Sequence, residues 1–202
     1  MTIVDDEQTT VDGRHLRARA NREAIVEALV ALYAEGHADP SAAEIAQRAG
    51  VSERSLFRHF DDIDDLCHTA FEVQWARLAE RSMVPTPRMA SAQERVRTVV
   101  SRRVQLYIDM MNVMRITRMH AVRNATVAAH IRTSRTELRR QHERLFEQEL
   151  RAMSAEEAHA AKTSIEALLS FEHVEQLRLD QGMSAARIEQ TLTAALLHQL
   201  RP

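Results

Sequence analysis

The sequence predicts an all-α protein of about nine helices. Only four glycines and four prolines occur among 202 residues, so the chain has few places at which it can turn sharply. Hydrophobic residues make up 45% of the chain, which is enough for a substantial core. Apolar residues recur at helical spacing in one segment after another, and no segment is a convincing strand. These observations favour long helices over many short strands.

The N-terminal segment changes charge and then becomes periodic. Residues 1–12 are acidic and have little to bury, so we expect a disordered acidic tail. From Gly13 the sign reverses, and four arginines follow without an acid among them: Arg14, Arg17, Arg19 and Arg22. A helix is then predicted by apolar residues on one face, with Gly36 as its natural end: Ile25, Ala28, Leu29 and Leu32.

Two short helices are predicted next, joined by a tight turn. Ser41 and Glu44 have the spacing of a capping box, and Gly50 ends the helix that they open. Ser52 can cap the following helix, whose inner pair is Leu56 and Phe60. Two short helices that meet at "AGVS" (49–52) have the arrangement of a helix-turn-helix.

The rest of the chain reads as a helical bundle. Asp62 is expected to cap a fourth helix with Asp64 and Asp65 in its first turn, and Pro85 and Pro87 break the chain after it. Five further helices are predicted: 96–111, 112–124, a long one over 126–151, one that begins at the capping box of Ser154 and runs through 177, and one over 184–196. We therefore divide the chain into the tail (1–12), a helix-turn-helix domain (13–62) and a bundle (63–202).

Composition excludes several classes of protein. A net charge of −2 argues against a protein that coats nucleic acid non-specifically through a large net positive charge. Any DNA binding must therefore come from positive charges gathered on one part of the surface. A single cysteine, Cys67, excludes an internal disulfide and a multi-cysteine zinc site. The N-terminus lacks the features of a secretion signal, and no apolar run approaches the roughly 20 residues that span a bilayer. We expect a cytoplasmic protein without a membrane partner.

The helix-turn-helix region resembles the TetR family of bacterial transcriptional regulators. The resemblance rests on an Ile-Ala pair (45–46), Ala-Gly-Val-Ser (49–52) and Ser-Leu-Phe-x-His-Phe (55–60), and it covers about 45 residues. The C-terminal segment from Ser170 is also similar to the closing helix pair of that family. The middle of the chain is typical of it only in the number and length of its helices.

The resemblance implies a homodimer whose recognition helices enter successive major grooves of a near-palindromic DNA operator. It also implies that the bundle holds a pocket for a small-molecule effector, here expected to be apolar or aromatic, whose binding releases a repressor from DNA. Whether the effector of this chain releases DNA or promotes its binding stays open at this point. No cofactor and no metal are expected.

The predicted recognition helix supplies most of the candidate DNA contacts. Leu56 and Phe60 turn inward, so Glu53, Arg54, Phe57 and Arg58 face outward. The Arg54 guanidinium can donate two hydrogen bonds to guanine, and the Glu53 carboxylate can accept one from the cytosine amino group. Hydroxyl and imidazole groups can donate to phosphate oxygens. The remaining candidates are Arg14 and Arg17 of the basic segment, Ser41, Ser52, Ser55 and His59. The alternatives are solvated surface arginines and a structural hydrogen bond for His59.

Two departures from the family pattern bear on affinity. The family often has tyrosine where Phe57 stands, and it usually has lysine at the start of the fourth helix, where this chain has Ile63. Ile63 is flanked by four acids near the expected phosphate backbone: Asp61, Asp62, Asp64 and Asp65. We expect weaker DNA binding that depends more on the basic segment, with the aspartates serving mainly as helix caps.

Methionine and aromatic residues in the bundle are the candidate effector contacts, because flexible thioethers and aromatic rings suit an apolar ligand. They are Phe71, Trp75, Tyr107, Met110, Met111, Met114, His142 and Phe171. The alternative is ordinary core packing. Apolar stripes on the last helices are the candidate dimer interface: Ile165, Leu168, Leu169, Ile188, Leu192 and Leu196. The alternative is that these stripes complete the core of one chain.

Two functions from other classes compete with a regulator. An enzyme would need a motif such as a phosphate-binding glycine loop, a Gly-x-Ser-x-Gly elbow or His-Glu-x-x-His, and the sequence contains none of these. A di-iron bundle needs two Glu-x-x-His pairs, and only Glu156 with His159 is present. We therefore expect no enzymatic activity. A degenerate regulator that binds ligand without DNA would explain Ile63 and its aspartates.

Overall fold

The computed structural model describes residues 6–84 and 91–201, with side chains from Leu16 onward. The described residues form eleven helices and no strand, so the predicted all-α class is confirmed. The helices are α1 (Asp6–Ala34), α2 (Ala42–Ala49), α3 (Glu53–His59), α4 (Ile63–Ser82), α5 (Ala92–Asp109), α6 (Met111–Ala121), α7 (Ala125–Leu145), α8 (Glu147–Arg151), α9 (Ala155–Leu168), α10 (Phe171–Leu179) and α11 (Ala185–Gln199). None of them, within the described ranges, is long and apolar enough to cross a membrane.

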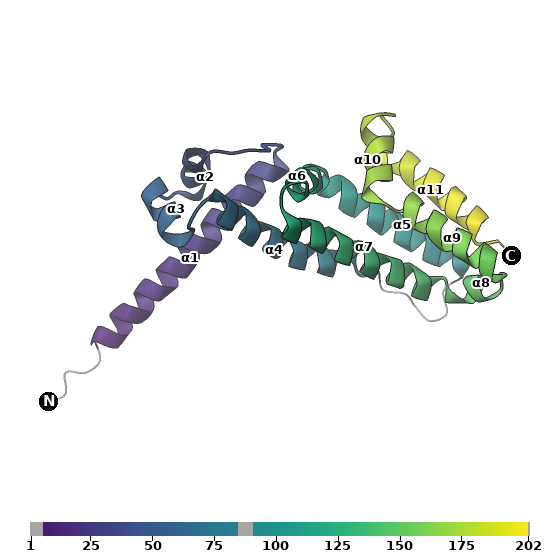
Figure 1. Cartoon of the computed structure of the whole chain (residues 1–202), viewed down its shortest axis with the longest axis horizontal. Coiled ribbons are helices and arrows are strands. Elements are labelled where there is room, and N and C mark those ends of the chain that lie inside the picture. Colours follow the sequence, from purple (N-terminus) through teal and green to yellow (C-terminus); the bar gives the residue numbers. More distant parts are fainter. Residues whose placement is uncertain (1–5, 85–90, 202) are drawn as a thin grey trace.

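The molecule is elongated, with a small head at one end and a larger body at the other (Figure 1). The head comprises α1, α2, α3 and the first turns of α4, and the body comprises the rest of α4 and helices α5–α11. The helix α4 runs from the head into the body, where it packs against α5 and α7.

Local capping signals place the helices of the head. Ser41 and Glu44 form the predicted capping box, and α2 ends at Gly50, whose φ of 70° is left-handed and favours glycine. Ser52 caps α3 by accepting a hydrogen bond from the Ser55 amide, and Asp62 caps α4 by accepting one from the Asp65 amide. Ile25, Leu29, Ile45, Leu56 and Leu66 are fully buried between these helices. The predicted caps and inner faces of the head are confirmed.

Two predicted helices are each broken in two, which accounts for eleven helices in place of nine. The predicted helix over 126–151 divides at Phe146, a fully buried residue that leaves helical geometry between α7 and α8. The predicted helix over 154–177 divides between α9 and α10, where Ser170 caps the new helix by accepting a hydrogen bond from the His173 amide. Apolar periodicity continues across both breaks and therefore conceals them.

The first helix starts earlier than expected. It begins at Asp6, so residues 6–12, which we expected in a disordered tail, are helical. Residues 1–5 lie outside the described residues. From Leu16 to Ala20 every side chain is exposed, and Leu16 is 65% exposed. This part of α1 has no buried face, so hydrophobic periodicity could not reveal it.

The C-terminal helices complete the core of the single chain. The helix α11 packs along α5 and also contacts α9 and α10. Leu192, like Ile188 and Leu196, is 0% exposed, and Ile165 and Leu169 are 1% exposed. A side chain with no exposed surface has none to bury against a second copy. Within one chain these five residues therefore lie in the core, and Leu168 is partly exposed, so the dimer-interface role of this set stays a prediction.

Candidate nucleic-acid interface and ligand cavity

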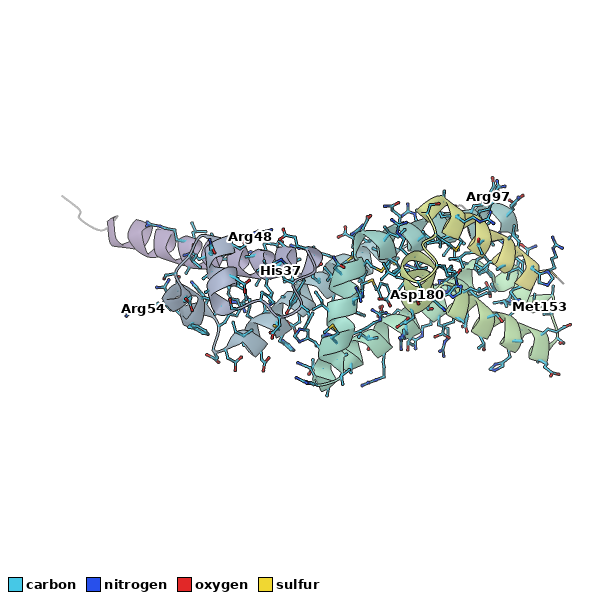
Figure 2. All side chains as sticks on the ribbon, turned by 90° about the horizontal axis from the view of Figure 1, so that it is seen from above. His37, Arg48, Arg54, Arg97, Met153 and Asp180 are labelled. Carbon is cyan, nitrogen blue, oxygen red and sulfur yellow. The ribbon has the colours of Figure 1, made fainter. Side chains whose placement is uncertain are left out.

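The outward face of α3 is a compact polar surface at the end of the head. Glu53, Arg54 and Arg58 are exposed, and Phe57 is 48% exposed between them. Arg54 projects away from the body (Figure 2). Leu56 is fully buried on the opposite side of the helix, which fixes the outward direction of the other four. An exposed seven-residue helix with two arginines can present its side chains to the major groove of DNA.

The small polar residues of this surface are partly engaged in local hydrogen bonds. The Ser41 hydroxyl lies 2.7 Å from Glu44 Oε2 and accepts a hydrogen bond from the Glu44 amide, as part of the α2 cap. The Ser55 hydroxyl accepts a hydrogen bond from Arg58 Nη2 over 3.0 Å, which orients that guanidinium. Ser52 is exposed and has a cap role as well. The Ser52 and Ser55 hydroxyls act as acceptors in these bonds and can still donate to a phosphate, whereas the Ser41 hydroxyl already donates its proton to Glu44.

His59 lies at the end of α3, where its surroundings disfavour the protonated imidazole. Burial lowers the pKa of its imidazole, and the nearby charges of Arg58 and Arg22 lower it further. Its Nε2 atom is buried and has no hydrogen-bond partner within the described ranges. Arg22 lies over the Phe60 ring, with its guanidinium carbon 4.7 Å from the ring centroid, and its Nη2 donates to Thr69 Oγ1. The structure thus places Arg22 in the packing of the head and leaves His59 half-buried beside it.

The basic segment is only partly described. Arg17 lies on the exposed part of α1. Arg14 belongs to the same helix, but its side chain lies outside the described residues. Figure 1 shows that this end of α1 extends beyond the head and away from the body.

Two of the four aspartates beside the recognition helix serve as caps. Asp62 Oδ1 accepts a hydrogen bond from the Asp65 amide over 2.8 Å, and Asp65 Oδ2 accepts one from the Asp61 amide over 3.2 Å. Asp64 is exposed in the first turn of α4, and the Asp61 side chain is also exposed. Ile63 is partly buried and packs against the core with its whole side chain. A lysine at this position could pack only its aliphatic stem there and would keep its ammonium group in water.

A cavity of about 390 Å³ lies in the body between α4, α5, α6, α7, α9 and α10. The structure brings together in its wall seven of the eight residues singled out from the sequence as effector contacts: Phe71, Trp75, Tyr107, Met110, Met114, His142 and Phe171. Met111 is the exception, because it is not among the residues that line the cavity. The size and the mainly apolar wall are typical of small-molecule sites.

Buried polar groups interrupt this apolar wall. Arg103 is 0% exposed, and His142 is 6% exposed, with no hydrogen-bond partner at either ring nitrogen in the part of the chain that the structure describes. Burial, and then the charge of Arg103, lower the pKa of His142 to about 3, so its ring is neutral at neutral pH. The Tyr107 hydroxyl donates to the Leu169 carbonyl over 3.2 Å, and burial raises its pKa.

The helix α4 joins the cavity to the head. Its first turns carry Leu66 and Cys67 in the head core, and its middle carries Phe71 and Trp75 in the cavity wall. The helix α6 also contacts both parts, because Val113 and Met114 line the cavity while Asn112 Nδ2 donates to the Ala34 carbonyl of α1 over 2.8 Å.

An aromatic cluster fills the junction itself. The Tyr33 ring stacks on Phe71 with their centroids 6.1 Å apart, and the His120 ring meets Phe71 edge-on at 5.2 Å. The Tyr33 hydroxyl lies 3.1 Å from Cys67 Sγ and 3.4 Å from His120 Nε2. A displacement of Phe71 by a ligand would therefore press directly on α1 of the head.

Comparison with known proteins agrees with this geometry. Residues 24–70 match the family described as "Bacterial regulatory proteins, tetR family". The head is a TetR-family head. The matched segment ends at Ala70, so it takes in the helix-turn-helix and the part of α4 that packs in the head. Among curated protein sequences, none is significantly similar to this chain.

Solved structures of transcriptional regulators share the fold over nearly the whole chain. A transcriptional regulator from Rhodococcus sp. Rha1 has a TM-score of 0.68 at 20% identity, over 89% of this chain and 95% of its own. A putative TetR-family regulator from Rhodococcus sp. has a TM-score of 0.67 at 16% identity, over 90% and 99%. A putative transcriptional regulator from Saccharomonospora viridis, in complex with choline, has a TM-score of 0.70 at 17% identity, over 88% and 95%.

Sequence reasoning missed one residue of the body that the structure makes prominent. Arg103 stands on the apolar face of α5, spaced three and four residues from Val100 and Tyr107. The sequence did contain a sign of this, because an arginine at a position of an apolar helical stripe is expected to be buried. The signal is weak by itself, because an arginine at the edge of such a stripe usually reaches solvent.

Proposed function

We propose that this protein is a ligand-responsive transcriptional regulator, a repressor that binds a near-palindromic operator as a homodimer and is released by a small effector. The observation that carries the proposal is the course of α4, which belongs to the DNA-binding head at one end and to the cavity wall at the other. A ligand that fills the cavity therefore contacts the same helix that packs in the head. An effector can shift DNA affinity only by binding the two states of the head unequally.

The exposed face of α3 supports sequence-selective readout. The Arg54 guanidinium can donate two hydrogen bonds to guanine O6 and N7, which contributes about 1–3 kcal/mol of discrimination against another base. The half-exposed Phe57 ring suits contact with a thymine methyl group. Ser52, Ser55 and the basic segment of α1 are suited to phosphate contacts, which fix the register of the protein on the duplex.

Dimerisation follows from this use of DNA. A single seven-residue recognition helix contacts few base pairs, and two heads related by a two-fold axis read two half-sites about one helical turn apart. The regulator from Saccharomonospora viridis shows that a similar fold can hold a small organic molecule. We propose binding as the activity of the cavity in this chain, without catalysis.

Selection from a pool of random duplexes tests the proposal. Purified protein is mixed with the pool at near-physiological salt, and the retained DNA is sequenced. We expect an enriched inverted repeat, and we expect Arg54→Ala to relax the preference at one base position in each half-site. Arg48→Ala is the matched control, because Arg48 is an exposed head arginine that forms an ion pair with Glu35. A folded protein that enriches no sequence would instead support a degenerate regulator.

A further inference from the structure

Within residues 6–84 and 91–201, the buried guanidinium of Arg103 in the cavity wall has no carboxylate partner. Arg103 is 0% exposed; its Nη1 donates to the Ser82 carbonyl over 3.1 Å, and its Nη2 donates to Gln141 Oε1. Both acceptors are neutral, and Nε has no partner among the described residues. The segment 85–90, which follows α4 in the sequence, contains no acidic residue. Buried charges are normally paired, so the site is incomplete as it stands.

The structural role of Arg103 accounts for only part of this arrangement. Ser82 is the last residue of α4, so Arg103 also caps the C-terminus of that helix. A helix C-terminus carries about half of a negative elementary charge, which leaves a buried guanidinium partly uncompensated. The Nε–H group remains available to a further acceptor.

His142 supplies a second unused donor on the neighbouring helix. It follows Gln141, the residue that holds Arg103, and its ring lines the same cavity. A neutral imidazole has one N–H donor and one acceptor nitrogen, and neither has a partner among the residues described here. Arg103 and His142 together therefore offer two free donors and one net positive charge, which matches a single carboxylate group.

The charged residues of the cavity wall also favour an anion. Four arginines and two glutamates line it, a surplus of two positive charges, although the whole chain has a net charge of −2. Arg118 and Arg135 share the carboxylate of Glu172, and Arg139 pairs with Glu166. The glutamates are thus already neutralised, and the surplus charge would repel a cation.

The remainder of the wall is apolar and limits the size of the ligand. A volume of about 390 Å³ would hold on the order of 13 water molecules at liquid density. Phe71, Trp75, Met110 and Phe171 contribute large apolar or aromatic groups to it. The cavity therefore suits a molecule of about a dozen non-hydrogen atoms with one polar end.

We propose that the cavity binds an amphipathic monocarboxylate, whose carboxylate accepts hydrogen bonds from Arg103 and His142 and whose chain or ring lies among Phe71, Trp75 and Phe171. The binding site stands on the geometry of the cavity alone. The role of this acid as the effector rests on the proposed function.

Matched ligands test the charge of the polar end. The probes are 4-phenylbutyrate, its amide and 4-phenylbutylamine, together with octanoate and octanamide, each titrated without DNA at about neutral pH, where a carboxyl group is ionised. Trp75 lies in the cavity wall and is the single tryptophan of the chain, so its fluorescence reports binding, with calorimetry as a second measurement. We expect each acid to bind about ten- to a hundredfold more tightly than its amide, and the amine to bind least.

Variants assign the preference to Arg103. Arg103→Gln should reduce the affinity for the acid to that for the amide, and Arg103→Lys should keep part of the preference because it keeps the charge. Arg102→Gln is the matched control, since Arg102 is an exposed neighbour outside the cavity wall that donates to the Met83 carbonyl. Circular dichroism shows whether each variant folds.

The outcomes are decisive in either direction. The proposal is overturned if no acid binds more tightly than its amide to the unmodified protein, whatever the variants do. A folded Arg103→Gln protein that keeps the full preference also overturns it. Because DNA is absent, a failure of operator binding leaves these results intact, and a failure of acid binding leaves the selection of DNA sequences intact.

Discussion

Replacing His142 by leucine should reduce the loss of stability that this protein suffers as the pH falls from 7 to 5. His142 is 6% exposed, and its pKa is lowered from 6.5 to about 3 by burial and by the charge of Arg103. The unfolded chain therefore binds a proton at this residue below about pH 6.5, whereas the folded chain does not. Protonation favours the unfolded state, and stability falls with pH across this range.

The magnitude follows from the lowered pKa. At pH 5 the unfolded histidine is mostly protonated while the folded one is neutral, which costs about 2 kcal/mol relative to pH 7. Leucine has no proton to bind and is of similar size. The variant should therefore lose about 2 kcal/mol less than the wild type between pH 7 and pH 5.

Urea unfolding followed by circular dichroism, at pH 7, 6 and 5 and one fixed protein concentration, measures this difference. The charged groups around His142 are common to both proteins and cancel in the comparison: Arg103 from α5, Arg139 and Glu143 from α7, and Lys162 and Glu166 from α9. Parallel losses of stability in the two proteins would refute the reasoning, because they would mean that His142 takes up a proton equally in both states.

Two further predictions follow from packing and charge. Leu192→Ala should lower the free energy of unfolding by about 2–5 kcal/mol, because Leu192 is fully buried in the core of one chain. The control Leu179→Ala should change this free energy little, because Leu179 is half-exposed. Urea unfolding and sedimentation measure the two effects, and a dimer that dissociates at unchanged monomer stability would instead support an interface role for Leu192. Asp61→Asn should raise operator affinity a few-fold, measured by fluorescence anisotropy at fixed salt, because the Asp61 side chain is exposed and has no cap role. Asp62→Ala should instead lower the free energy of unfolding by about 1 kcal/mol, because the α4 cap is lost. Equal operator affinity for Asp61→Asn and wild type would show that this acid faces away from DNA.

The head could be predicted closely because its signals are local. Ser41, Ser52 and Asp62 each cap the helix that the sequence assigns to them, and Gly50 ends α2 with a positive φ. Capping preferences and glycine stops depend on a few neighbouring residues, so they can be identified without the tertiary structure. These signals predicted the short helices of the head, whereas its similarity to the TetR family was recognised from the residue pattern at 45–46, 49–52 and 55–60.

The body could be predicted in outline only, because its details depend on packing. The breaks at Phe146 and Ser170 lie within continuous apolar periodicity, and the start of α1 has no apolar face at all. Periodicity shows that a helix face is buried but not what covers it. This is why the sequence did not show that the stripe containing Leu192 is buried within one chain, and why the buried charge of Arg103 was missed.

The coupling between the cavity and the head is the central claim, and one measurement tests it directly. The affinity of the protein for its selected operator is measured by fluorescence anisotropy with and without 4-phenylbutyrate, while Trp75 fluorescence reports that the cavity is saturated. We expect the ligand to weaken operator binding by about 5–150-fold, the usual range of such coupling. An unchanged operator affinity with a saturated cavity would contradict the claim, because α4 would then transmit nothing from the cavity to the head.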